Sequence, residues 1–125
     1  MKLSDNFFIS TGYQERQGDR LVARVCLNPS HFIYKAHFPD NPITPGVCII
    51  QMATELLEQA LGWELEIDVI HNVKFLSLLI PKEGEYIELS FHGGKTDDNH
   101  IKVKCNITDR DTIVSSLSIT YTVHE

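Results

Sequence analysis

The feature that most constrains how this 125-residue chain can fold is a helix predicted over residues 47–61. Pro45 is well tolerated at a helix start because the N–H it lacks would be unpaired there, and Thr44 can cap the first turn. Gly62 follows the last apolar residue and ends the helix. The apolar positions occupy most of the circumference: 47, 48, 49, 50, 52, 53, 56, 57, 60 and 61. A helix with so wide an apolar surface is expected to be buried, so the rest of the chain must cover it.

Most of the remaining chain favours β-strands. Short β-favouring runs at Phe7–Tyr13 and Leu21–Leu27 flank a turn at Gly18-Asp19, and Trp63–Ile80 is rich in β-branched and aromatic residues. Apolar and polar residues then alternate in Ile87–Phe91, Ile101–Ile107 and Leu117–Val123. Turns are predicted at His92–Gly94 and at Asp109–Thr112, and residues Asp97–Asn99 are polar. This period of two predicts an antiparallel sheet with one wet face. The expected fold is α+β, one domain over residues 1–125, with five or six strands covering the helix.

Composition limits which binding partners and which cellular compartment are expected for the protein. The formal charge is −6, from 17 acidic and 11 basic residues, which disfavours nucleic acid or an anionic membrane as the main partner. Three scattered cysteines form no C-x-x-C pair, so we interpret them as small apolar residues of a reducing compartment. The N-terminal residues contain no long apolar stretch, and no run is long enough to span a bilayer. We therefore expect a soluble cytoplasmic protein.

The segment from His37 to Gln51, HFPDNPITPGVCIIQ, carries the functional information. Prolines at every third residue keep its first part extended and stiff, and its second part enters the apolar helix. The run H-F-P-x-x-P-x-x-P-G-V before such a helix resembles the β-hydroxyacyl-acyl carrier protein dehydratases (FabZ/FabA type) of the hotdog fold. The lead-in NPSHFIYKAHFP and the later run from His71 to Leu89 are similar to the same family, so most of the chain is covered.

The resemblance implies a fold, an assembly and a reaction. In the hotdog fold an antiparallel sheet wraps around one long central helix, and two protomers pair to build each site at their interface. The implied reaction is dehydration of a (3R)-hydroxyacyl thioester, on acyl carrier protein or coenzyme A, to the trans-2-enoyl thioester of fatty-acid or related acyl-chain biosynthesis. The implied assembly is a homodimer or a higher homo-oligomer built from dimers. No cofactor is implied, and the other five histidines show no paired metal-ligand spacing.

By resemblance, His37 is the general base that removes the α-proton. A histidine suits this role because its reference pKa of about 6.5 lies near working pH. The amides of Gly46 and Val47 would bind the thioester oxygen, since a helix N-terminus offers unpaired N–H groups and positive potential. Gly46 also lets a ligand approach the backbone closely. Phe38, Ile49 and Ile50 are the expected lining of the acyl tunnel.

Gln51 departs from the family pattern. The matching position carries Glu or Asp, the acid that helps the β-hydroxyl leave as water, whereas an amide has no proton to deliver. Glu55 lies one turn later on the same helix face, so the usual order E-x-x-x-Q is exchanged. One hypothesis makes Glu55 the acid and Gln51 a group that orients water or the hydroxyl. The other places Glu55 in an exposed polar stripe with Gln51, Thr54, Glu58 and Gln59.

The sequence alone is compatible with three functions. The leading one is the hydro-lyase reaction, with His37 as base and Gln51 and Glu55 of the partner protomer handling the hydroxyl. A hotdog acyl-thioesterase is the first alternative, because such enzymes use a helix carboxylate beside an amide to activate water. The second is a non-catalytic subunit that binds an acyl thioester but has lost the acid.

Overall fold

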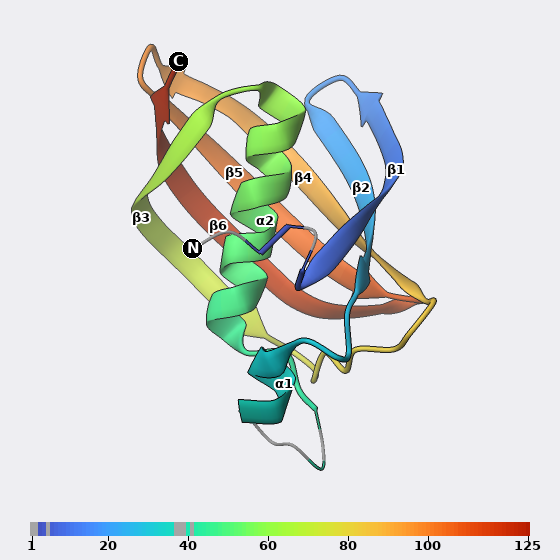
Figure 1. Cartoon of the computed structure of the whole chain (residues 1–125). Coiled ribbons are helices and arrows are strands. Elements are labelled where there is room, and N and C mark those ends of the chain that lie inside the picture. Colours follow the sequence, from blue (N-terminus) through green and yellow to red (C-terminus); the bar gives the residue numbers. More distant parts are fainter. Residues whose placement is uncertain (1–2, 5, 37–39, 41) are drawn as a thin grey trace.

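The computed structural model describes residues 3–4, 6–36, 40 and 42–125. It contains one six-stranded sheet in the order β1-β2-β4-β5-β6-β3, and all paired neighbours are antiparallel. The elements are β1 (Phe8–Gln17), β2 (Arg20–Leu27), α1 (Phe32–Ala36), α2 (Gly46–Leu61), β3 (Glu64–Phe75), β4 (Tyr86–Asp97), β5 (His100–Asp109) and β6 (Thr112–His124). The sheet curves around α2, which lies along its concave face (Figure 1). This is the hotdog arrangement, so the predicted fold class is confirmed.

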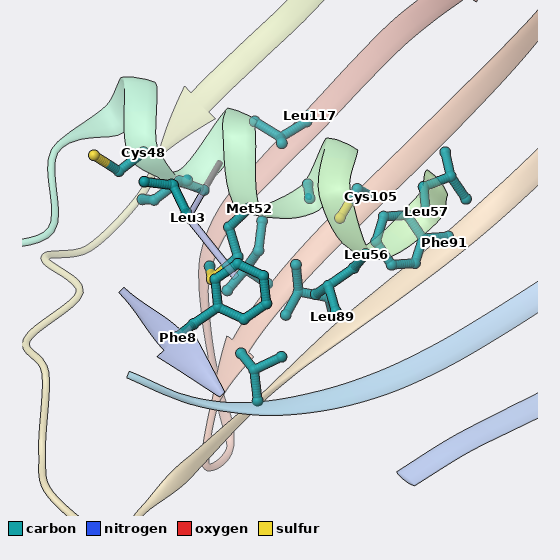
Figure 2. Close-up of a cluster of buried hydrophobic side chains, with 14 of the residues drawn as sticks. Leu3, Phe8, Cys48, Met52, Leu56, Leu57, Leu89, Phe91, Cys105 and Leu117 are labelled. Atoms are coloured by element: carbon teal, nitrogen blue, oxygen red, sulfur yellow. The ribbon is translucent and has the colours of Figure 1, made fainter. Parts of the chain in front are cut away.

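Alternating residues of the sheet meet the apolar side of α2 to form the core. In β5 the buried side chains are Ile101, Val103, Cys105 and Ile107, with exposed polar residues between them. Leu56 and Leu57 of α2 lie beside Leu89 and Phe91 of β4, and Met52 lies beside Phe8 (Figure 2). Cys48 and Cys105 are buried without a disulfide, which agrees with their interpretation as small apolar residues. Burial of these side chains holds the helix on the sheet.

The start of α2 differs in detail from the sequence prediction. The helix begins at Gly46, Pro45 is its N-cap, and no side chain caps it. The predicted cap by Thr44 is wrong because the Thr44 hydroxyl is hydrogen-bonded to the Tyr34 hydroxyl instead, at 2.9 Å. The other end is as predicted: Gly62 has φ 72° and its N–H donates to the Glu58 carbonyl.

The turn predicted at His92–Gly94 is wrong. β4 runs straight through these residues and turns only at Asp98-Asn99. Gly93 has φ 146°, and a Cβ there would collide with the carbonyl oxygen of Lys102 on β5. The glycine is therefore needed for close approach within the sheet, not for a turn.

Two local elements were not predicted. Helix α1 occupies five residues for which the sequence analysis gave neither a helix nor a strand. Just before β1 the Leu3 carbonyl accepts the Phe7 N–H at 2.8 Å, the hydrogen bond of a tight turn. Leu3, Phe7 and Phe8 are buried, so this N-terminal turn (residues 3–4 and 6–8) covers the side of α2 that faces away from the sheet (Figure 1).

Tyr121 joins the sheet to the helix through a buried hydrogen bond. Thr54 donates its hydroxyl proton to the Ile50 carbonyl at 2.9 Å, so the Tyr121 hydroxyl must be the donor in its 2.9 Å contact with the Thr54 oxygen. Burial, as the largest cause, raises the pKa of Tyr121 to about 12 from its ordinary 10.0. The folded state therefore keeps this proton at a pH where the unfolded chain loses it.

This arrangement predicts a loss of stability at alkaline pH. The contribution of Tyr121 is fully present below pH 10 and disappears as pH rises to about 12, at a cost on the order of 2–3 kcal/mol. Urea unfolding of wild type and Tyr121→Phe across this range should show a smaller decline for the variant. Tyr86→Phe, which alters an exposed tyrosine, is the control. Equal declines in wild type and Tyr121→Phe would contradict the assignment.

Candidate active site

The first turn of α2 is held in place by backbone hydrogen bonds before it and within it. The Thr44 N–H donates to the Leu79 carbonyl at 2.8 Å, and the Pro45 carbonyl accepts from Cys48 and Ile49 at 3.0 and 3.2 Å. The amides of Gly46 and Val47 come before the first intrahelical donors. The Val47 side chain is 73% exposed, so this end of the helix faces outward. These are the two amides that the sequence analysis expected to bind a thioester oxygen.

The ring of Phe75, the last residue of β3, covers Gly46. A Cβ added to Gly46 would lie 2.5 Å from Phe75 Cζ and 2.8 Å from Cε2. Carbon atoms cannot approach so closely, so any side chain at position 46 must displace the ring. Gly46 thus allows the end of β3 to pack directly on the helix start.

We expect Gly46→Ala to destabilise the protein by about 1 kcal/mol because the added methyl group displaces the Phe75 ring from its position on the helix start. In a Phe75→Ala background the same change should become neutral or stabilising, because alanine favours helix over glycine. A double-mutant cycle of unfolding free energies measures this coupling. Gly94→Ala, where a Cβ meets no atom within 4 Å, is the matched control. Additive effects of Gly46→Ala and Phe75→Ala would contradict the contact.

His37 and Phe38 lie outside the described residues, so their predicted roles stay predictions. The residues on either side of them are tied together. The hydrogen bond between Tyr34 in α1 and Thr44 joins two residues that lie on either side of His37 in the sequence. Burial raises the pKa of Tyr34 to about 12, and its ring stacks on Phe7 at 5.3 Å between centroids. Tyr34, on the N-terminal side of His37 in the sequence, is therefore packed against the N-terminal turn.

Gln51 and Glu55 are in direct contact. Gln51 is half-buried, and its Nε2 donates to Glu55 Oε2 at 2.8 Å. Glu55 is only 1% exposed, and Thr54 is also buried. The hypothesis of an exposed polar stripe is therefore wrong for Glu55 and Thr54. It failed because the N-terminal turn covers Glu55 and the sheet covers Thr54.

The Glu55 carboxylate is enclosed by backbone N–H groups. Oε1 accepts from Leu3 at 2.9 Å and from Ser4 at 3.0 Å, and Oε2 accepts from Leu3 at 2.8 Å. Leu3 and Ser4 are site residues that the sequence analysis missed. No sequence signal could have identified them, because they contribute backbone amides rather than side chains.

Two residues of the expected tunnel lining, Ile49 and Ile50, differ in their burial. Ile49 is buried in the core, and Ile50 is half-buried against it. A cavity of about 230 Å³ lies at the other end of α2, between Leu57, Leu61, Trp63 and Phe91. It includes neither Ile49 nor Ile50, so it is separate from the candidate site.

The residues that the structure describes include no group of three or more His, Cys, Asp or Glu side chains that could hold a metal ion. Among their helices, none combines the length and the apolar character needed to cross a membrane.

Comparison with known families decides the relationship of the chain. The ApeI-like family, described as ApeI dehydratase, matches residues 13–117, which include the whole segment from His37 to Gln51. The chain belongs to this dehydratase family. It is also 30% identical over 113 residues to 3-hydroxyacyl-acyl-carrier-protein dehydratase FabZ of Lactobacillus helveticus, covering 85% of this chain and 75% of the relative. The predicted family resemblance is confirmed.

Solved structures support the fold. The dehydratase heterocomplex ApeI:P from Xenorhabdus doucetiae matches with a TM-score of 0.68 and 22% identity, covering 91% of this chain and 96% of that one. A hypothetical thioesterase with coenzyme A from Streptococcus pneumoniae matches with a TM-score of 0.66 and 9% identity, covering 96% and 90%. At these identities the likeness concerns the fold alone. Hotdog proteins of both reaction classes share this architecture.

Proposed function

We propose that this protein dehydrates (3R)-hydroxyacyl thioesters, carried by acyl carrier protein or coenzyme A, to trans-2-enoyl thioesters in the cytoplasm. The observation that carries the proposal is the dehydratase family match over residues 13–117, which includes the HFPDNPITPGV run. The relative in Lactobacillus helveticus is a dehydratase of 3-hydroxyacyl-acyl-carrier-protein, which supports the substrate class. The outward-facing first turn of α2 supports a site for the thioester group.

In the proposed reaction His37 takes the proton from C2 of the acyl chain. The electron pair left on C2 is delocalised onto the thioester oxygen, where the Gly46 and Val47 amides stabilise the charge. The C2–C3 double bond then forms as the C3–O bond breaks. Because Gln51 has no acidic proton, the hydroxyl must leave as water with either the proton held by His37 or one from Glu55. Phe38 and Ile50 would contact the acyl chain.

The assay follows two products separately. With a 3-hydroxyacyl thioester we expect enoyl product, and with a saturated acyl thioester we expect no free thiol. His37→Ala should lower enoyl formation by at least 100-fold, since general base catalysis contributes about 10²–10⁴-fold. His124→Ala, which changes an exposed histidine at the end of β6, is the control. Full activity of His37→Ala would contradict the proposal.

We also propose a homodimer formed through β3. This strand is an edge of the sheet, and its residues Ile67, Val69 and Ile70 are each about 40–50% exposed. A long apolar edge strand is a liability unless another chain covers it. Leu76 and Leu78, just beyond β3, extend the apolar surface. Since Phe75 packs on Gly46, a partner at this edge would lie beside the helix start and could complete the site.

Light scattering after size-exclusion chromatography should give twice the 14.2 kDa chain mass for the wild type. We expect Val69→Glu to favour the monomer, because it places like charges in a symmetric contact of an already acidic protein. The matched control is Ile9→Glu on β1, the opposite edge strand, where the apolar side chain is also exposed. A dimer that persists in Val69→Glu but dissociates in Ile9→Glu would contradict the proposed edge.

Two other functions have specific support. The structural neighbours include thioesterases, so thiol release from the saturated substrate would favour that reaction. The ApeI:P neighbour is a heterocomplex, and Gln51 suits a subunit that has lost the acid. A protein that forms neither product, but becomes a dehydratase as Gln51→Glu, would be such a non-catalytic partner.

A further inference from the structure

The contact between Gln51 and Glu55 has a direction that chemistry fixes. An ionised carboxylate accepts hydrogen bonds and donates none, so the group of Gln51 that faces it must be the –NH₂. The 2.8 Å contact from Gln51 Nε2 to Glu55 Oε2 agrees with this requirement. The amide carbonyl is bonded to the same carbon and points away from Glu55. Gln51 therefore directs an acceptor, Oε1, away from the buried carboxylate.

Glu55 is itself prevented from turning. Its two oxygens accept from the Leu3 and Ser4 amides at 2.8–3.0 Å. These donors belong to the N-terminal turn, which is fixed by the buried side chains of Leu3, Phe7 and Phe8. The Phe7 carbonyl also accepts from the Asn28 N–H at 2.9 Å. A carboxylate held on one side by fixed backbone donors offers its remaining acceptor position to Gln51 in one orientation.

We propose that Glu55 is a positioning residue, which turns the Gln51 amide so that its carbonyl oxygen faces the substrate. The inference rests on the proposed function and specifies how the site distinguishes its ligand. A 3-hydroxyl group can donate a hydrogen bond to Gln51 Oε1, whereas a 3-oxo group has only acceptors and would face another acceptor. A carbonyl oxygen has two lone pairs, so it can accept the hydroxyl together with a second donor. The site therefore selects 3-hydroxyacyl over 3-oxoacyl thioesters.

The substitution Glu55→Gln tests this directly because it preserves size. Its carbonyl oxygen can still accept from Leu3 and Ser4 in the place of Oε1, but its –NH₂ takes the place of Oε2, which accepts from Leu3 and from Gln51. Gln51 is then expected to turn over, accept through Oε1 and present its –NH₂ to the ligand. The preference between hydroxyl and oxo ligands should change accordingly.

The measurement uses the pantetheine amides of 3-hydroxybutyrate and 3-oxobutyrate, which bind without a reactive thioester. We expect the wild type to bind the hydroxy compound roughly 10-fold more tightly, the value of one hydrogen bond. In Glu55→Gln the ratio should fall to about one or reverse. Glu58→Gln, on the same helix, also changes a carboxylate that accepts a backbone N–H, here from Leu65 at 2.9 Å. This control should leave the ratio unchanged.

A second readout does not depend on ligand or activity. In ¹⁵N-labelled protein, the Gln51 side-chain amide should exchange slowly with solvent in the wild type and in Glu58→Gln, because one N–H is bound to a buried carboxylate. The same signal should exchange at least 10-fold faster in Glu55→Gln. Should Glu55→Gln fail to fold, the exchanged pair Gln51→Glu/Glu55→Gln keeps one carboxylate and one amide, and it should restore both folding and hydroxy-compound binding.

The outcomes separate the two proposals. Tight binding with an unchanged ratio and an unchanged Gln51 signal in Glu55→Gln would overturn the positioning role alone. Failure of the wild type to bind either amide would overturn the proposed substrate class, with the Gln51 signal still reporting on the orientation. Loss of dehydration in Glu55→Gln with an unchanged binding ratio would instead make Glu55 the acid.

Discussion

The fold around the candidate site depends on the need to satisfy one buried carboxylate. A charged side chain removed from water costs several kcal/mol unless hydrogen bonds replace its hydration. Glu55 meets this requirement through the backbone amides of Leu3 and Ser4 and the side chain of Gln51. The first residues of the chain are therefore required at the middle of α2. Their burial there gives the helix a cover on the side that the sheet does not reach.

That cover connects three parts of the molecule that are distant in sequence. Phe7 stacks on Tyr34, and Tyr34 is hydrogen-bonded to Thr44 just before α2 begins. Residues on both sides of His37 in the sequence are thus fixed by the N-terminal turn and by α1. At the same helix start, Phe75 from the edge strand β3 packs on Gly46. The site is therefore positioned by the N-terminus on one side and by the exposed apolar edge of the sheet on the other.

Periodicity was sufficient to predict the architecture, but local details and the polar contacts needed the structure. The apolar surface of residues 47–61 and the alternation in β5 and β6 have direct physical meaning, and both were interpreted correctly. Gly93 was misinterpreted as a turn because close strand approach and turns both favour glycine. The burial of Glu55 could not be predicted, since its backbone donors are more than 50 positions away in the sequence. Only the i, i+4 spacing of Gln51 and Glu55 indicated in advance that the two would meet.

The most direct test of the account is a crystal structure of the protein with a bound 3-hydroxyacyl pantetheine amide. The decisive measurement is the distance from the ligand hydroxyl oxygen to Gln51 Oε1. We predict about 2.6–3.0 Å, the range of an O–H···O hydrogen bond, with Glu55 still bound to the Leu3 and Ser4 amides. A hydroxyl in contact with Glu55 itself, with the N-terminal turn displaced from α2, would contradict the account.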